Sequence, residues 1–247
     1  MQHRTPFKTV VAICAMSLTA LVFAAGCEDS ETTIDQPGVV NQGLSALSEL
    51  TGKTYILDIP SAQWTSPAGL GDEIVKVQPK YAFQVIDIDE SALTFTVLLG
   101  TAKNGAQDLC NKTYVIDGAL NAEDMTFTLG PIDVQTYFVG PKTEAMAACH
   151  DFTISGQIVD EGAGLVSGEM SAELDTRDIY PLFYMANVSS GEALCTEIAS
   201  WNMSCADCSY EPDASMCLDF VAEDFEVADS PDLTLTDVPA FDEFCLE

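Results

Sequence analysis

Alternation of apolar and polar residues between positions 54 and 174 most narrows the folds open to this sequence. A period of two over five to nine residues, broken by Gly, Pro, Asn and Asp, is typical of half-buried antiparallel strands. The clearest example runs from Leu93 to Leu99. Other apolar sets begin at Tyr55, Tyr81, Met125 and Ile132, and Phe152–Ile158 and Val166–Leu174 form a hairpin that turns at residues 160–162. Strands that recur without long helices between them predict an antiparallel β-barrel or a two-sheet β-sandwich.

The sequence changes character after Arg177. Leu194, Ile198 and Trp201 share one face of a predicted short helix, which Ser189 and Glu192 begin with the spacing of a capping box. Further short strands are expected over Leu218–Val221 and Leu233–Leu235, and a turn of helix is expected over residues 44–50. The predicted fold is therefore mainly β, with one short helix and a disulfide-rich C-terminal loop region.

The first 27 residues have the features of an export signal. Arg4 and Lys8 precede an apolar run that ends in Ala24-Ala25-Gly26-Cys27. That run is shorter than the roughly 20 residues that span a bilayer. Small residues before a cysteine match the bacterial lipobox, although Ala24 stands where leucine is usual. We therefore expect residues 1–26 to be a signal peptide and Cys27 to be acylated, for example with palmitate. Ordinary secretory cleavage near Ala25 is the alternative.

The remaining chain is expected to form one domain on a tether. Residues 27–43 are acidic, contain a Pro-Gly pair and lack apolar periodicity, as in a flexible linker. Residues 44–247 are long enough for a single β ectodomain with a substantial core. Within it, residues 188–247 form a cysteine-rich subdomain that closes the predicted sheet.

Strong acidity limits the partners of this chain. The sequence has 39 Asp and Glu against 9 Lys and Arg, and none of those 9 lies between Asp178 and Glu247. Phosphate backbones require clusters of basic residues, so nucleic acid is excluded as a partner. Basic protein surfaces and divalent cations remain compatible with the charge, which also keeps an exported domain soluble. The sequence leaves the oligomeric state open.

The cysteines downstream of Cys27 are interpreted as disulfide-forming, because exported proteins oxidise their thiols. We expect Cys110 to pair with Cys149. Two bridges are expected among Cys195, Cys205, Cys208 and Cys217, in any of three connectivities. Cys245 remains as the odd thiol, or alternatively pairs within that C-terminal cluster. The alternatives are zinc binding by Cys195, Cys205, Cys208 and Cys217, or redox chemistry at Cys205-Ala-Asp-Cys208.

No catalytic constellation or cofactor motif stands out. His150 is the only histidine after the signal peptide, and its neighbour Cys149 would point to the opposite face of a strand. Acidic residues at two predicted turns (Asp87, Asp89 and Glu90; Asp160 and Glu161) lack the spacing of a calcium loop. Turn aspartates usually accept hydrogen bonds from their own backbone. We expect no catalytic residues, no metal site and no cofactor.

Several segments resemble a group of uncharacterised bacterial lipoproteins from myxobacterium-like Gram-negatives. The similarity lies in AAGC at 24–27, KTYILDIPSAQW at 53–64, PAGLGD at 67–72, ISG…VSGEMSAELDTRDIYPL at 154–182 and the cysteine spacing from Cys195 to Cys217. The resemblance implies an anchored, all-β ectodomain and assigns no activity to any residue.

Together these features predict an outer-membrane lipoprotein of the cell envelope, held to the lipid bilayer through acylated Cys27. Which face of the membrane carries it is open. Its expected role is non-catalytic display or interaction. The alternative is a lipocalin-like carrier whose barrel holds a small apolar ligand. An enzyme is the least expected reading.

Overall fold

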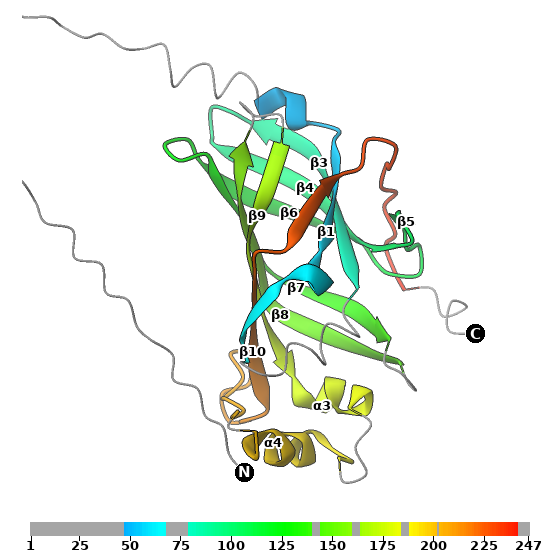
Figure 1. Cartoon of the computed structure of the whole chain (residues 1–247), viewed down its shortest axis with the longest axis vertical. Coiled ribbons are helices and arrows are strands. Elements are labelled where there is room, and N and C mark those ends of the chain that lie inside the picture. Colours follow the sequence, from blue (N-terminus) through cyan, green and yellow to red (C-terminus); the bar gives the residue numbers. More distant parts are fainter. Residues whose placement is uncertain are drawn as a thin grey trace, which may run out of the picture. The chain divides into compact units, whose positions relative to one another are not determined.

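A computed structural model describes residues 47–67, 79–139, 144–159, 164–183, 188–201 and 203–241 (Figure 1). The chain divides into two compact units, Met1–Gln36 and Pro37–Glu247, and all described residues belong to the second. Cys27, Asp160, Glu161 and Cys245 are not among the described residues. No helix in the described part of the chain is long and apolar enough to cross a membrane.

The described residues form a mainly β domain, as the alternating pattern predicts. Its strands are β1 (Thr54–Asp58), β2 (Gln63–Ser66), β3 (Lys80–Asp89), β4 (Thr94–Lys103), β5 (Ala106–Gln107), β6 (Tyr114–Asn121), β7 (Thr126–Val139), β8 (Glu144–Val159), β9 (Gly164–Asp175), β10 (Cys217–Glu223) and β11 (Glu226–Asp229). Its helical segments are α3 (Thr176–Ile179), α4 (Gly191–Ala199) and the 3-10 turns η1 (Ser48–Leu50), η2 (Ile59–Ser61) and η4 (Tyr180–Leu182).

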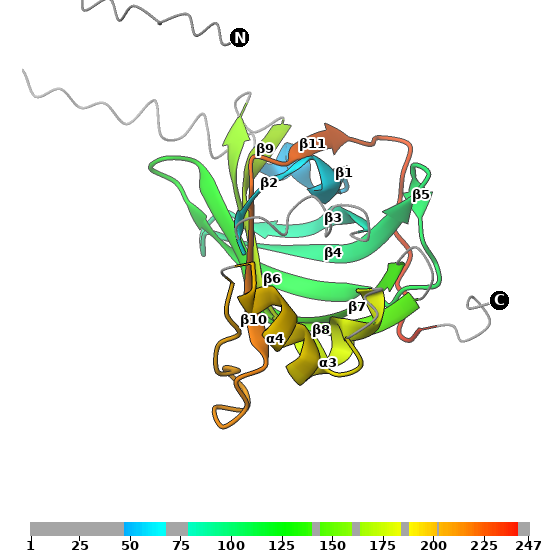
Figure 2. The same ribbon diagram turned by 60° about the horizontal axis from the view of Figure 1, so that its bottom comes forward.

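All of these strands belong to one antiparallel sheet that curls into a barrel-like wall (Figure 2). The order along the sheet is β11-β1-β3-β4-β6-β7-β8-β9-β10-β2, with β5 paired to β4. At its two ends, Tyr55 of β1 pairs with Asp229 of β11, and Ser66 of β2 pairs with Val221 of β10. Because β1 and β2 follow each other in the chain, as do β10 and β11, these pairings connect the two ends. A barrel-like sheet, rather than two separate sheets, therefore resolves the alternative left open by the sequence.

The inward residues of the strands form one continuous apolar core. Every second residue of β4, for example Phe95, Val97 and Leu99, is buried in this core. Two turn residues, Leu93 and Met125, have positive φ and precede β4 and β7 rather than belonging to them. The alternation therefore identifies the inward face correctly and overextends the strands by a residue at these turns.

Gly130 allows β7 to continue through a point where the sequence indicates a break. Its φ is +89°, and a Cβ at this position would lie 2.4 Å from the backbone oxygen of Phe152. The register of β7 against β8 shifts between Leu129 and Ile132, so Pro131 falls at an irregularity, where a missing N–H is tolerated. Glycine is required here both by the backbone conformation and by the close approach of β8.

Short helices lie at the two ends of the barrel (Figure 1). Leu50 of η1 is buried at one end, and α3 and α4 lie at the other. Helix α4 confirms the predicted helix, but its N-cap is Ser190, whose Oγ accepts a hydrogen bond from Ala193 N at 3.2 Å. The expected cap at Ser189 is therefore wrong by one residue. Trp201 lies beyond the helix and is exposed, because α4 ends at Ala199.

Residues 230–241, which we call the C-terminal strap, run along the outer face of the sheet without forming a strand. The strand expected over Leu233–Leu235 is therefore wrong. Leu235 is nevertheless buried, because it packs with Ala82, Leu98 and Ala102 on the outer side of β3 and β4. Strap backbone groups do not form a ladder with a neighbouring strand: Leu235 N donates to the side chain of Gln84 at Oε1, 3.1 Å away, and Ser230 N donates to the carbonyl of Thr54 at 2.8 Å. The apolar residues of this segment reflect packing, not sheet pairing.

Candidate functional site

Two disulfides brace the C-terminal region, as the sequence predicts. Cys195 bonds to Cys205 and Cys208 bonds to Cys217, which selects one of the three connectivities. The second bridge is buried, and Ala206 pairs with Cys217 in an isolated antiparallel bridge. We call residues 205–217 the cysteine loop. Both expected bridges within this cluster are confirmed.

The expected bridge between Cys110 and Cys149 is wrong. Cys149 is a free thiol, 4% exposed, on the inward face of β8 opposite Val134 of β7. Burial, followed by the nearby charge of Asp178, raises the pKa of the Cys149 thiol to about 12. Cys110 is disulfide-bonded and lies between β5 and β6. Proximity in the sequence suggested the pairing, but it carries no information on which face of β8 Cys149 occupies.

Asp175, Arg177 and the cysteine loop form an ion-pair network at the end of the barrel. Asp175 Oδ1 and Oδ2 accept hydrogen bonds from Arg177 Nε at 3.0 and 2.8 Å, and Arg177 Nη2 lies 2.6 Å from Glu211 Oε2. Tyr210 donates its hydroxyl proton to Asp175. Burial acts to raise the pKa of Asp175, but hydrogen bonds from Arg177 and Tyr210 outweigh it and hold that pKa below its ordinary value. The network holds the cysteine loop against the end of β9.

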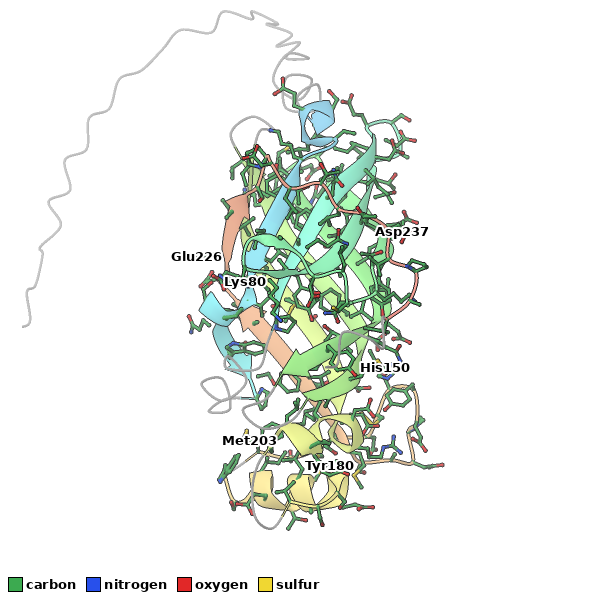
Figure 3. All side chains as sticks on the ribbon, turned by 90° about the vertical axis from the view of Figure 1, so that its right-hand side faces the viewer. Lys80, His150, Tyr180, Met203, Glu226 and Asp237 are labelled. Atoms are coloured by element: carbon green, nitrogen blue, oxygen red, sulfur yellow. A yellow bond between two sulfur atoms is a disulfide. The ribbon has the colours of Figure 1, made fainter. Side chains whose placement is uncertain are left out.

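A second set of contacts holds the same loop against the outer faces of β8 and β9. Ser209 N donates to both carboxylate oxygens of Glu173, at 3.0 and 3.1 Å. The ring of His150 stacks on Tyr210 with 3.9 Å between centroids, and its Nδ1 lies 3.2 Å from Asp133 Oδ1 (Figure 3 labels His150). Cys149 and His150 therefore occupy opposite faces of β8, as their adjacency predicts. Their geometry does not form a Cys–His pair.

Among the described side chains of the kinds that bind metals, the cysteines of the cysteine loop and Asp89 have other roles. Glu173, Cys208 and Cys217 place ligand-type atoms within 4.8 Å of one another. Both sulfurs belong to one disulfide, so neither is a thiolate available to zinc. Asp89 Oδ1 accepts a hydrogen bond from Ser91 Oγ at 2.6 Å, and others from Ala92 N and Ser91 N at 2.9 Å, which together lower the pKa of that carboxyl group. Asp89 therefore stabilises its own turn, as expected.

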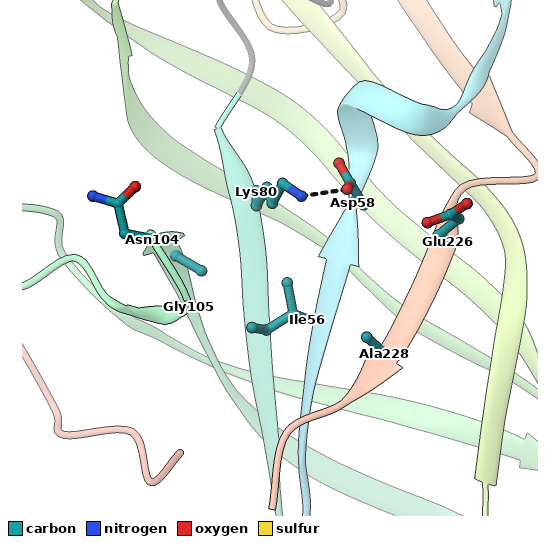
Figure 4. Close-up of a pocket in the computed structure, with 8 residues that line it drawn as sticks. Ile56, Asp58, Lys80, Asn104, Gly105, Glu226 and Ala228 are labelled. Carbon is teal, nitrogen blue, oxygen red and sulfur yellow. Dashed lines mark hydrogen bonds and ion pairs between the residues drawn. The ribbon is translucent and has the colours of Figure 1, made fainter. Parts of the chain in front are cut away.

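A pocket of about 420 Å³ lies on the outer face of the sheet, on the side where Lys80 and Glu226 are labelled in Figure 3. Its lining comes from β1, β3, β11, the end of β4 and the β4–β5 turn (Figure 4). Ile56, Ala102 and Ala228 supply apolar lining, and Asn104 lies at the turn. We call this site the outer pocket.

The outer pocket is lined by two charged groups that form an ion pair with each other and by a third that does not join it. Lys80 forms an ion pair with Asp58, whereas the carboxylate of Glu226 has no ion-pair partner among the described residues. The lining therefore carries an excess negative charge beside apolar surface. This combination suits a long aliphatic side chain that ends in a cation. Sequence reasoning missed the pocket because its residues come from four segments, each with an ordinary outward-facing pattern.

Many aromatic side chains are buried in the core on the inner side of the sheet. The buried aromatic residues are Tyr55, Tyr81, Phe83, Phe95, Phe127, Phe138, Phe152, Phe220 and Phe225. The hydroxyls of Tyr55 and Thr101 are buried without a hydrogen-bond partner among the described residues. Burial, followed by the charge of Asp229, raises the pKa of Tyr55 to about 12. These hydroxyls are points at which an interior water or ligand would find a hydrogen bond.

Comparison with known proteins adds no assignment to this geometry. No family model matches the chain, and neither a curated protein nor a solved structure matches it.

Proposed function

We propose that this protein is an extracytoplasmic lipoprotein, acylated at Cys27, whose acidic β domain is a non-catalytic interaction module. It is held at the outer membrane by its acyl chains. The observation that carries this proposal is the disulfide-braced cysteine loop, since such bridges persist in oxidising compartments and are rare in the cytosol. The sequence Ala24-Ala25-Gly26-Cys27 supplies the attachment point. Burial of many aromatic side chains in the core favours display over the carrier role.

Replacing Cys27 with serine is expected to abolish labelling by radioactive palmitate and to remove the processed protein from the membrane fraction. The reason is that a serine hydroxyl cannot accept the thioether-linked lipid. Cys14→Ser is the matched control, because it makes the same change within the signal and retains Cys27. The measurement is palmitate incorporation and membrane partition of the full chain in a Gram-negative host. Unchanged processing and partition of the Cys27→Ser variant would contradict the anchor.

The outer pocket is the proposed contact point of the interaction module, and its occupant is a lysine or arginine side chain of a basic protein partner. The apolar lining from Ile56, Ala102 and Ala228 accommodates the methylene stem, and Glu226 faces the charged head. The large excess of acidic residues attracts such a partner over long range. Because Glu226 is exposed, its ion pair with the partner contributes little binding free energy, and that contribution decreases as the salt concentration rises.

Charge reversal by Glu226→Lys is expected to weaken binding of a lysine-rich peptide about fivefold, because an exposed ion pair contributes about 1 kcal/mol. The control is Glu123→Lys, an equal change of charge at an exposed turn outside the pocket. Calorimetric titration at low and physiological salt measures both. If the two variants weaken binding equally, the peptide responds only to overall charge, and the pocket is not the contact point.

A further inference from the structure

We infer that the disulfide partner of Cys110 is Cys245, so that the C-terminal strap is covalently fastened across the outer face of the barrel. Cys110 is disulfide-bonded, and every cysteine from Cys195 to Cys217 is already paired. Cys149 is free and faces the interior. The remaining candidates within the chain are Cys14, Cys27 and Cys245. Setting aside Cys14 and Cys27 rests on the proposed function, because the first belongs to the signal and the second carries the lipid.

Hydrogen bonds direct the strap toward Cys110. Gln107 Nε2 donates to the carbonyl of Thr236, and Thr236 N donates to Gln107 Oε1, both at 2.7 Å. Two residues further along, Thr113 N donates to the carbonyl of Val238 at 2.9 Å, and Val238 N donates to Thr113 Oγ1 at 2.8 Å. The strap therefore follows the segment that contains Cys110 on both sides of that residue.

An aromatic contact brings the end of the described strap close to the neighbour of Cys110. Phe241 packs edge-on against Tyr137, with 6.1 Å between ring centroids. Tyr137 N in turn donates to Oδ1 of Asn111 at 3.2 Å. Cys245 is four residues beyond Phe241, and four extended residues reach at most about 14 Å. A disulfide requires a Cα separation of about 4.4–6.8 Å, and the bonds of Thr236 to Gln107 and of Val238 to Thr113 already place the strap beside both flanks of Cys110.

The chemistry is the same as in the two bridges of the cysteine loop. Each thiol loses a proton and an electron, the two Sγ atoms join, and the disulfide of an extracytoplasmic thiol oxidase is reduced to a dithiol. The bond closes the long loop from Cys110 to Cys245, so it constrains the unfolded state strongly. It also keeps Leu235 over Ala82, Leu98 and Ala102.

The direct test is digestion of the full chain, purified from membranes without reductant, by trypsin and a glutamate-specific protease. The expected product is the peptide of residues 104–112 joined to the peptide of residues 244–247, and reductant should separate them. Recovery of residues 104–112 joined to a Cys27 peptide would overturn both this inference and the anchor. A joined pair of two 104–112 peptides would overturn the inference alone. If the expected product is found on a chain without lipid, only the anchor fails.

Variants give an independent measurement. Cys110→Ser and Cys245→Ser should each raise the number of titratable thiols in the denatured, acylated chain by one, and the double variant should restore the wild-type number. Each single variant and the double variant should share the same fall in Tm, about 10 °C, because all three lack the same bond. A lower thiol count in Cys245→Ser than in the wild type would show that the two residues are not bonded to each other. So would a decrease in Tm in the double variant that equals the sum of the decreases in the two single variants.

Discussion

Replacing Phe152 with alanine is expected to lower the free energy of unfolding by about 3–5 kcal/mol, the largest effect we predict for a single residue. The side chain is 1% exposed on the inward face of β8, with its ring centroid 5.6 Å from that of Tyr81. Alanine would remove this packing and leave a cavity that the surrounding strands fill poorly. Urea unfolding followed by tryptophan fluorescence measures the loss.

Val115→Ala is the matched control for this prediction. Val115 also lies on a central strand, β6, but its side chain is 61% exposed, so its truncation should change stability by no more than about 0.5 kcal/mol. If both variants lose equal stability, residue 152 is not part of the core and the assignment of the inward face of β8 is wrong.

Replacing Asp175 with alanine is expected to cost about 2–3 kcal/mol. It removes the N-cap of α3 and leaves Arg177 and Tyr210 without their shared acceptor. Loss of one partner of a fully buried ion pair costs about 3–5 kcal/mol, and the value here is lower because the Arg177 side chain is 43% exposed. Asp219→Ala, an exposed aspartate on β10, is the control.

The effect of Asp175 should also depend on pH in a defined direction. Its folded-state pKa lies below the ordinary value of 3.8, so the ionised carboxylate contributes full stability at pH values above 3.8. That contribution is lost as the pH falls through the folded-state pKa. The stability difference between wild type and Asp175→Ala should therefore narrow below about pH 4. A difference that stays constant down to pH 2 would contradict the network.

Patterns within single segments predicted much of this fold. Alternation in β4 and in the β8–β9 hairpin identified inward residues such as Phe95 and Ile154, because burial on one face of a strand imposes a period of two. The opposite placement of Cys149 and His150 follows from the same geometry. Strand β6 was not predicted, although Ile116 and Leu120 have the right spacing. Its exposed Val115 and the outward Ala119 weaken the contrast between the two faces.

Features that depend on contacts between distant segments could not be predicted from the sequence. The closure of the sheet depends on β1 and β2 changing partners along β10 and β11, and β11 is too short to show a period. Leu233 and Leu235 alternate as in a strand, yet Leu235 N bonds to the side chain of Gln84 and the strap forms no strand ladder. The outer pocket combines residues from four segments. The ion-pair network around Arg177 joins the end of β9 to Tyr210 of the cysteine loop, 33 residues further along the chain.

The intact mass of the unreduced protein, extracted with detergent from its native membrane, tests the central claim most directly. The account predicts a single chain that begins at Cys27, carries diacylglyceryl and amide-linked acyl groups, and gains six hydrogens on reduction: two for each cysteine-loop bridge and two for the bridge at Cys110. A chain without lipid that begins at another residue, or one whose mass does not change on reduction, would contradict it.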